Sequence, residues 1–212
     1  STFMRWEAIE EINIYGSRHT MERVDDLING VVLRGTRPPM PLSLLDIKPG
    51  LIFSAENFDI TAFPVDHRGS SSLGYRFDER PRRPFLPEKA EALQIPPGPW
   101  RKDLVDGKPI TLLDGRVILP DQVLGEEKRG ASLVVVGDVG RPEKLVEHIQ
   151  GADTLVIEST YLLEEQEMAA EFGHTTAAAV AGIAREAGVG RLILTHVSRR
   201  YRDEDILAEA RA

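Results

Sequence analysis

The chain has 212 residues, 42% of them hydrophobic, and a formal net charge of −8 at pH 7. This length and hydrophobic content suffice for one substantial domain with its own core. No apolar run of about 18 residues is present and the first residues lack a signal-peptide pattern, so we expect a cytoplasmic protein without a membrane partner. Because cysteine is absent, a metal site must use histidine and carboxylate ligands.

The negative charge argues against a uniformly basic nucleic-acid-binding surface, but the charge is unevenly distributed. Residues 80–129 hold ten Lys and Arg against eight Asp and Glu. A second basic cluster comprises Arg191, Arg199, Arg200 and Arg202. The negative net charge of the whole chain therefore conceals local basic patches.

Residues 1–79 alternate short apolar runs with turns. The segments "INIYG" and "GVVLRG" are predicted to be strands or helix ends. The segment "DITAFPVDH" is predicted to be a strand ending in His67, and "LGYRFDE" the next strand after a turn in "RGSSS".

Residues 80–130 differ in composition, because they hold eight of the fourteen prolines and two Asp-Gly pairs. A segment of this length without regular periodicity is unusual inside a compact domain and is commonly functional. We therefore expect an inserted arm with a small hairpin in "KPITLLDGRVILP".

Residues 131–212 have the pattern of an α/β fold. The predicted strands are "ASLVVVGDV", "DTLVIEST" and "RLILTHVS", and the predicted helices are "RPEKLVEHIQG", "LLEEQEMAAEF" and "TTAAAVAGIAREAG", the last two separated by Gly173-His174. Continuous apolar strands favour burial on both faces, as in a sheet covered by helices. The whole of 1–212 is expected to form a single domain with the arm inserted.

Three predicted strands end in a residue that can bind a metal ion: His67, Asp138 and His196. Each alone is more often a turn or cap residue. Together, in a chain with five histidines, they favour one shared site at a rim of strand ends. Imidazole and carboxylate are the ligands of hydrolytic zinc sites.

His174, at a predicted helix start, could face a phosphate or act as a general acid, although a capping-region histidine without a role fits the spacing equally well. His148 is expected on the exposed face of a helix and His19 near a helix start, and neither is assigned a function. The sequence lacks the GxGxxG, P-loop, GxSxG and HExxH motifs.

Five segments in order resemble ribonuclease Z, a family of tRNA 3′-processing endonucleases in the metallo-β-lactamase superfamily. They are "FPVDHRGSSSLGYRF", the arm "EKAEALQIPPGPWRKDLVDGKPITLLDGRVILPDQVLG", "VVVGDV", "FGHTTA" and "LTHVSRRY". The resemblance spans nearly the whole chain. It implies an α/β fold, the αββα sandwich of the superfamily, here incomplete at both ends, with a protruding arm at about 80–130.

The resemblance also implies an activity: zinc-dependent hydrolysis of a phosphodiester bond in precursor tRNA, leaving a 3′-hydroxyl. Two zinc ions per complete site and a homodimer, in which the arm of one subunit holds tRNA for the other, are further implications. The implied site residues are His67 and His196 as zinc ligands, Asp138 as a bridging ligand, His174 in protonating the leaving 3′ oxygen, Arg199 and Arg200 at the RNA backbone, and Gly98 and Pro99 in an arm that grips the tRNA elbow.

Two departures from the family pattern limit this reading. The main zinc motif, His-x-His-x-Asp-His, is absent from the 212 residues and is expected to precede Ser1, so this chain alone is expected to be inactive. In addition, Val139 in "GDVG" replaces the usual threonine after the bridging aspartate. Two alternatives therefore stay open: a metal-dependent hydrolase of small phosphodiesters, and a non-catalytic relative that binds RNA.

Overall fold

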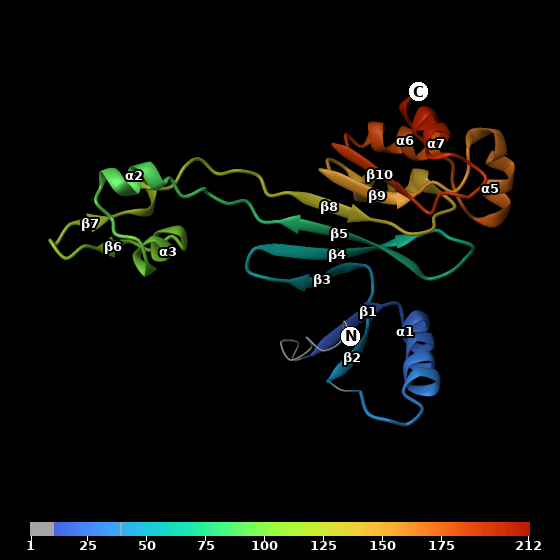
Figure 1. Cartoon of the computed structure of the whole chain (residues 1–212), viewed down its shortest axis with the longest axis horizontal. Coiled ribbons are helices and arrows are strands. Elements are labelled where there is room, and N and C mark those ends of the chain that lie inside the picture. Colours follow the sequence, from blue (N-terminus) through green and yellow to red (C-terminus); the bar gives the residue numbers. More distant parts are fainter. Residues whose placement is uncertain (1–10, 39) are drawn as a thin grey trace. The chain divides into compact units, whose positions relative to one another are not determined.

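The computed structural model describes residues 11–38 and 40–212. The chain forms two compact units (Figure 1). The first comprises Ser1–Asp78 and Ser132–Ala212, and the second comprises Glu79–Ala131. The range predicted for the arm, 80–130, lies within the second unit.

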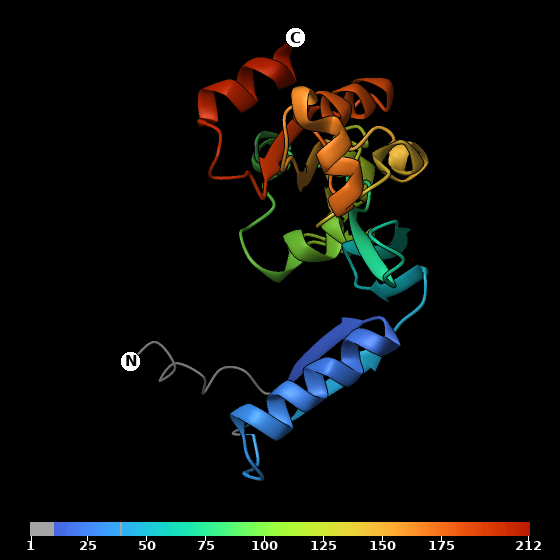
Figure 2. The same cartoon turned by 90° about the vertical axis from the view of Figure 1, so that its right-hand side faces the viewer.

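The first unit begins with a small βαβ element. Strands β1 (Ile12–Gly16) and β2 (Leu42–Asp46) pair in parallel, and α1 (Arg18–Asp25) connects them through a π-helical segment, Asp26–Val32. Figure 2 shows α1 lying along this pair of strands. Of the two options for "GVVLRG", the structure has the helix end, whereas "INIYG" is a strand.

A six-stranded sheet forms the centre of the first unit, in the order β10-β9-β8-β5-β4-β3. Strands β8, β9 and β10 are parallel to one another, and β5 is antiparallel to β8. Figure 1 shows β4, β8 and β9 pointing the same way and β5 the opposite way. The carboxyl ends of β4, β8, β9 and β10 therefore share one edge of the sheet. The bounds are β3 Gly50–Ser54, β4 Phe58–Val65, β5 Ser72–Glu79, β8 Ser132–Val135, β9 Thr154–Glu158 and β10 Arg191–Thr195.

Short helices connect the parallel strands. They are a 3₁₀ turn Pro142–Leu145 leading into α4 (Val146–Ile149), a 3₁₀ turn Leu163–Glu165 leading into α5 (Gln166–Phe172), and α6 (Ala177–Glu186). A further helix, α7 (Asp203–Arg211), follows β10. Gly173 ends α5 in the left-handed conformation, with φ of 72°, which glycine adopts without steric cost. Thr176 caps α6 by accepting a hydrogen bond from the Ala179 amide at 3.2 Å. None of the described helices has the length and apolar character that crossing a bilayer requires.

The core lies between the sheet and the helices. Strand residues Val134, Leu155 and Ile157 are buried against helix residues such as Ile149 and Val180. The expected burial of these strands on both faces is only partly correct, because Leu133 on β8 and Ile193 on β10 are 37% and 42% exposed. The helices that supply apolar partners pack against one face, so alternate side chains of β8 and β10 remain accessible.

The prediction that His148 lies on an exposed helix face was wrong. Its ring stacks on Phe63 with 4.6 Å between centroids and an interplanar angle of 12°, and the residue is half-buried. The guanidinium of Arg76 donates hydrogen bonds to the carbonyls of His148 and Gln150 at the end of α4. His148 is therefore part of the packing of α4 onto β4.

The second unit is folded around its own core. It contains α2 (Pro87–Ala92), α3 (Pro99–Val105) and the hairpin β6–β7 (Ile110–Thr111 and Val117–Ile118), and this hairpin lies where it was predicted. The two helices were not predicted, because prolines suggested loop; Pro87 and Pro99 instead occupy the first helical position, which tolerates proline. The buried core residues are Ala90, Ile95, Leu104, Ile110, Leu112, Ile118 and Val123.

Candidate metal centre

The candidate ligands converge where the parallel strands end. His67 follows β4, Asp138 follows β8, and His196 directly follows β10. One potential ligand atom from each of His67, Asp138 and His174 lies within 4.8 Å of the other two. His196 is adjacent, with its Nε2 3.7 Å from Asp138 Oδ1 and its ring centroid 5.3 Å from that of His174. The shared strand direction is the physical reason that residues so distant in sequence meet.

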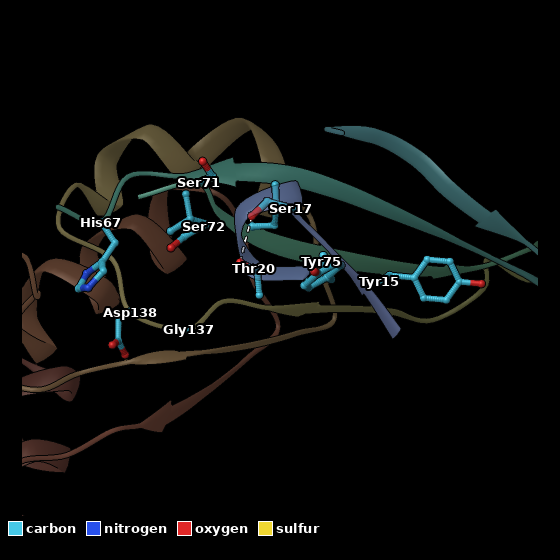
Figure 3. A pocket seen from close by; sticks show the side chains of 12 residues that line it. Tyr15, Ser17, Thr20, His67, Ser71, Ser72, Tyr75, Gly137 and Asp138 are labelled. Carbon is cyan, nitrogen blue, oxygen red and sulfur yellow. Dashed lines mark hydrogen bonds between the residues drawn. The ribbon is translucent and has the colours of Figure 1, made fainter. Parts of the chain in front are cut away.

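His67 is held in a defined orientation by the backbone of a distant loop. Its Nδ1 lies 2.8 Å from the carbonyl oxygen of Gly173. Because a carbonyl only accepts, Nδ1 carries the proton and Nε2 keeps its lone pair. Figure 3 shows the imidazole of His67 and the carboxylate of Asp138 facing each other at one end of a cleft. A ligating histidine is typically oriented in this way by a hydrogen bond from its other nitrogen.

His174 is oriented by a buried carboxylate, Glu158. The Nδ1 of His174 lies 3.0 Å and 3.1 Å from the two carboxylate oxygens of Glu158, whose side chain is fully buried. The carboxylate also accepts a hydrogen bond from the Val139 amide at 2.5 Å and one from the Thr160 hydroxyl. With Nδ1 occupied by Glu158, Nε2 of His174 remains for other contacts.

Glu158 is the main site residue that the sequence reasoning missed. It ends β9, which lies between the strands that precede Asp138 and His196. The available signal was a single acid at the end of an otherwise apolar run, "TLVIE". A buried carboxylate requires several partners, and those partners come from three separate loops.

Val139 contributes through its backbone and its burial. Its side chain is 0% exposed and packs in the main hydrophobic core, while its amide bonds to Glu158. The position that departs from the family pattern therefore lies in the core, where a valine side chain is well accommodated.

An ion pair joins the loops that contain His67 and Asp138. The Lys144 ammonium donates to Asp66 Oδ2 at 2.7 Å, and Arg141 Nε lies 3.7 Å from the same oxygen. The hydrogen bond from Lys144, together with the charges of Lys144 and Arg141, holds the pKa of Asp66 below its usual range. The Gly140 amide also donates to the Asp66 carbonyl at 2.7 Å. These contacts fix one loop against the other.

Two residues at the site have backbones in the left-handed region. His196 has φ of 53° and Arg68, which directly follows His67, has φ of 49°. Residues other than glycine seldom adopt this conformation, although asparagine, aspartate and histidine do so more often than the rest, and residues in such sparsely populated conformations are concentrated at functional sites. The His196 carbonyl lies 3.1 Å from the Thr160 hydroxyl, the same group that donates to Glu158.

The structure separates the predicted RNA-binding residues into two groups. Arg199 and Arg200 are exposed in the loop after His196, and Arg200 pairs with Glu165 at 3.1 Å. Gly98 and Pro99 lie in the second unit, where Gly98, with φ of 129°, directly precedes the first residue of α3.

The nitrogen and oxygen ligands of this site suit a divalent metal ion that is intermediate between hard and soft, such as zinc. Neutral imidazole and carboxylate are the ligands that zinc accepts in the absence of thiolates. His67 meets the further requirement of a free nitrogen with a fixed ring orientation. The ligands of this chain are nevertheless fewer than two four-coordinate ions require.

The fold identifies the class of protein. The metallo-β-lactamase-fold protein YhfI from Bacillus subtilis superposes on the chain with a TM-score of 0.58 at 17% identity, over 95% of this chain and 58% of that one. Human tRNase Z, short form, gives a TM-score of 0.53 at 21% identity, over 92% of this chain and 64% of that one. The expected fold is thus confirmed: the chain has the metallo-β-lactamase fold.

Sequence comparison identifies the family. Ribonuclease Z of Bradyrhizobium sp. (strain ORS 278) is 43% identical over 212 residues, which are 100% of this chain and 70% of the relative. Ribonuclease Z of Bradyrhizobium diazoefficiens is 40% identical over 210 residues, 99% of this chain and 69% of the relative. No family model matches the chain. The chain belongs to the ribonuclease Z family, and hence to a family of endoribonucleases.

Proposed function

We propose that the protein containing this chain is a zinc-dependent endoribonuclease that removes the 3′ trailer from precursor tRNA in the cytoplasm. The observation that supports this proposal most directly is the convergence of His67, Asp138 and His174 within 4.8 Å at one edge of the sheet. The ribonuclease Z relatives supply the substrate class.

In the proposed mechanism, His67, His196 and Asp138 would hold the metal, and His174 would donate a proton to the leaving oxygen. Zinc held by these residues would supply a hydroxide nucleophile at neutral pH and would offset charge on the phosphate. Asp138 is close to both histidine ligands, since a ligand atom of His67 lies within 4.8 Å of it and Nε2 of His196 lies 3.7 Å from its Oδ1.

His174 would donate the proton from Nε2 to the 3′ oxygen that leaves, because Nδ1 is engaged by Glu158. Breaking the phosphodiester bond on that side leaves a 3′-hydroxyl on the tRNA and a 5′-phosphate on the trailer. The negative charge of Glu158 would offset the positive charge of a protonated His174.

The arm distinguishes this function from hydrolysis of small phosphodiesters. A separately folded unit with its own core, Glu79–Ala131, is unnecessary for a small substrate and suits recognition of a folded RNA by shape and backbone. We propose further that Gly98, Pro99 and neighbouring residues of this unit contact tRNA, and that the protein is a homodimer in which one subunit's arm serves the partner's site.

The test is cleavage of precursor tRNA by the protein that contains this chain, combined with metal analysis. His196→Ala should abolish cleavage and reduce the bound zinc, since it removes a ligand. His148→Phe is the matched control, because it replaces a histidine outside the site and preserves the ring stack on Phe63. Unchanged turnover and unchanged zinc content in His196→Ala would contradict the assignment.

A further inference from the structure

A polar cleft extends from the candidate metal centre toward the first turns of α1. One cavity of about 400 Å³ is lined by His67 and Asp138 at one end and by Ser17 and Thr20 of the α1 segment at the other. A second cavity of about 400 Å³ has Arg23 and the serine-rich turn in its wall. The cavities share the lining residues Ser17, Thr20, Ser71 and Ser72, so they adjoin each other, and together they are called the serine cleft. Figure 3 shows these four side chains beside the His67–Asp138 pair.

The wall of the second cavity has the chemistry of a phosphate site. Its lining residues include two arginines, Arg23 and Arg68, together with His19 and the serines of the turn at residues 70–72. No carboxylate is among the described residues that line this cavity. Guanidinium and hydroxyl groups are the usual protein donors to phosphate oxygens. This cavity has no aromatic side chain in its described lining on which a base could stack.

Both arginines are available for a ligand. Within residues 11–38 and 40–212, neither Arg23 nor Arg68 has a carboxylate partner, whereas Arg18 on the same helix pairs with Glu22 at 3.1 Å. Both side chains belong to exposed residues. Two arginines without acidic partners in one cavity repel each other, and a bound anion would relieve that repulsion.

Arg68 also links the cleft to the metal centre. It directly follows His67, and its left-handed backbone, φ of 49°, turns the chain away from the end of β4. Its aliphatic stem packs against Gly173, which precedes His174 and accepts the hydrogen bond from His67. The aliphatic stem of Arg68 therefore lies beside the loop that orients His67.

We propose that the serine cleft binds the phosphodiester backbone of the nucleotides next to the bond that is cut, with Arg23 and Arg68 as the phosphate contacts. This inference rests on the proposed function, since it concerns the same RNA substrate. The contacts proposed for Arg23 and Arg68 are to phosphate groups, so these two contacts are independent of base sequence.

The test compares Arg23→Gln and Arg68→Gln with Arg18→Gln in the protein that contains this chain. Arg18→Gln removes the same charge from the same helix but lies outside the lining of the cleft. Equilibrium binding of a precursor tRNA with a trailer of about six nucleotides is measured over a range of salt concentrations. Each cleft variant should weaken binding by roughly 3- to 10-fold. It should also reduce the slope of log binding constant against log salt concentration by about 1, because one phosphate contact is lost and about one fewer counterion is released.

Two further measurements make the result decisive. Arg68→Lys, which retains the charge, should recover much of the affinity, and zinc content reports whether Arg68→Gln has disturbed the neighbouring His67. Shortening the trailer to one nucleotide shows which side of the cut occupies the cleft. If Arg23→Gln then no longer weakens binding, the trailer occupies the cleft. If Arg23→Gln still weakens binding, the acceptor stem occupies the cleft.

The cleft assignment is overturned if Arg23→Gln and Arg68→Gln bind precursor tRNA as Arg18→Gln does, with an unchanged salt dependence. That outcome differs from failure of the proposed function, in which the unaltered protein itself neither binds nor cleaves precursor tRNA.

Discussion

Glu158 and His174 form a carboxylate–imidazole pair in which the carboxylate is fully buried and 3.0 Å from Nδ1 of the ring. The pair connects the end of β9 to the loop between α5 and α6. A buried carboxylate with an amide, a hydroxyl and an imidazole as partners is a rigid support. It determines which nitrogen of His174 faces the candidate metal centre.

Replacing Glu158 with glutamine should therefore impair the reaction without removing His174. The amide can present an N–H group to Nδ1 and so favour the opposite tautomer. Because a general acid typically contributes about 10²- to 10⁴-fold to a rate, we expect its misorientation to slow cleavage by at least about 10-fold. The measurements are cleavage of precursor tRNA and nitrogen NMR shifts of the His174 ring. Glu164→Gln, at an exposed position nearby, is the control. An unchanged tautomer together with an unchanged rate would show that the pair is only structural.

Gly173→Ala should reduce both stability and metal affinity. The left-handed backbone, φ of 72°, costs an alanine about 1–2 kcal/mol. An added Cβ would also lie 2.3 Å from Cγ of Arg68, which forces a shift where the Gly173 carbonyl holds His67.

Gly188→Ala is the matched control, because its φ is 67° and an added Cβ there meets nothing within 4 Å. Both variants should lose stability in chemical denaturation, but only Gly173→Ala should lose zinc affinity. Equal zinc affinity in the two variants would contradict a positioning role for the Gly173 carbonyl.

Replacing about residues 85–128 with a short glycine–serine linker should weaken binding of precursor tRNA and leave hydrolysis of a small chromogenic phosphodiester largely intact. The reason is that the main core of the first unit contains no residue from Glu79–Ala131, so the sheet and the metal centre lose no packing. Binding and hydrolysis are measured on the same preparations. If both fall together, the second unit stabilises the first and is not a separate substrate-binding element.

The arm hairpin should show a defined response to acid through Asp114. The backbone amide and then the guanidinium of Arg116 donate hydrogen bonds to the Asp114 carboxylate at 3.0 Å and 2.7 Å, and they lower its pKa from the ordinary 3.8. Because the folded-state pKa lies below the unfolded-state pKa, the stabilisation is complete above the unfolded-state value. It is lost as the pH falls through the folded-state value.

Arg116→Gln should consequently raise the pKa of Asp114 toward its ordinary value and reduce the acid sensitivity of the hairpin. A carbon-detected NMR titration of the carboxyl group measures both proteins. Superimposable titration curves would show that the guanidinium of Arg116 has no influence on Asp114.

Local sequence determined much of the first unit and the hairpin of the second unit. The apolar runs before His67, Asp138 and His196 predicted β4, β8 and β10, and the glycine before His174 predicted the end of α5. The Asp114-Gly115 pair predicted the β6–β7 turn, because glycine adopts the positive φ, here 85°, that such turns require. These features depend on neighbours in the chain, so the sequence by itself was sufficient for them.

Tertiary structure alone decided how those elements meet. The order β10-β9-β8-β5-β4 places Glu158 between the loops of Asp138 and His196, and no local pattern contains that order. The packing of helices on one face left Leu133 and Ile193 accessible, and the stacking of His148 on Phe63 half-buried a residue predicted to be exposed. Each of these results depends on contacts between residues far apart in the chain, whose free energy is set by the packed sheet and helices rather than by any single segment.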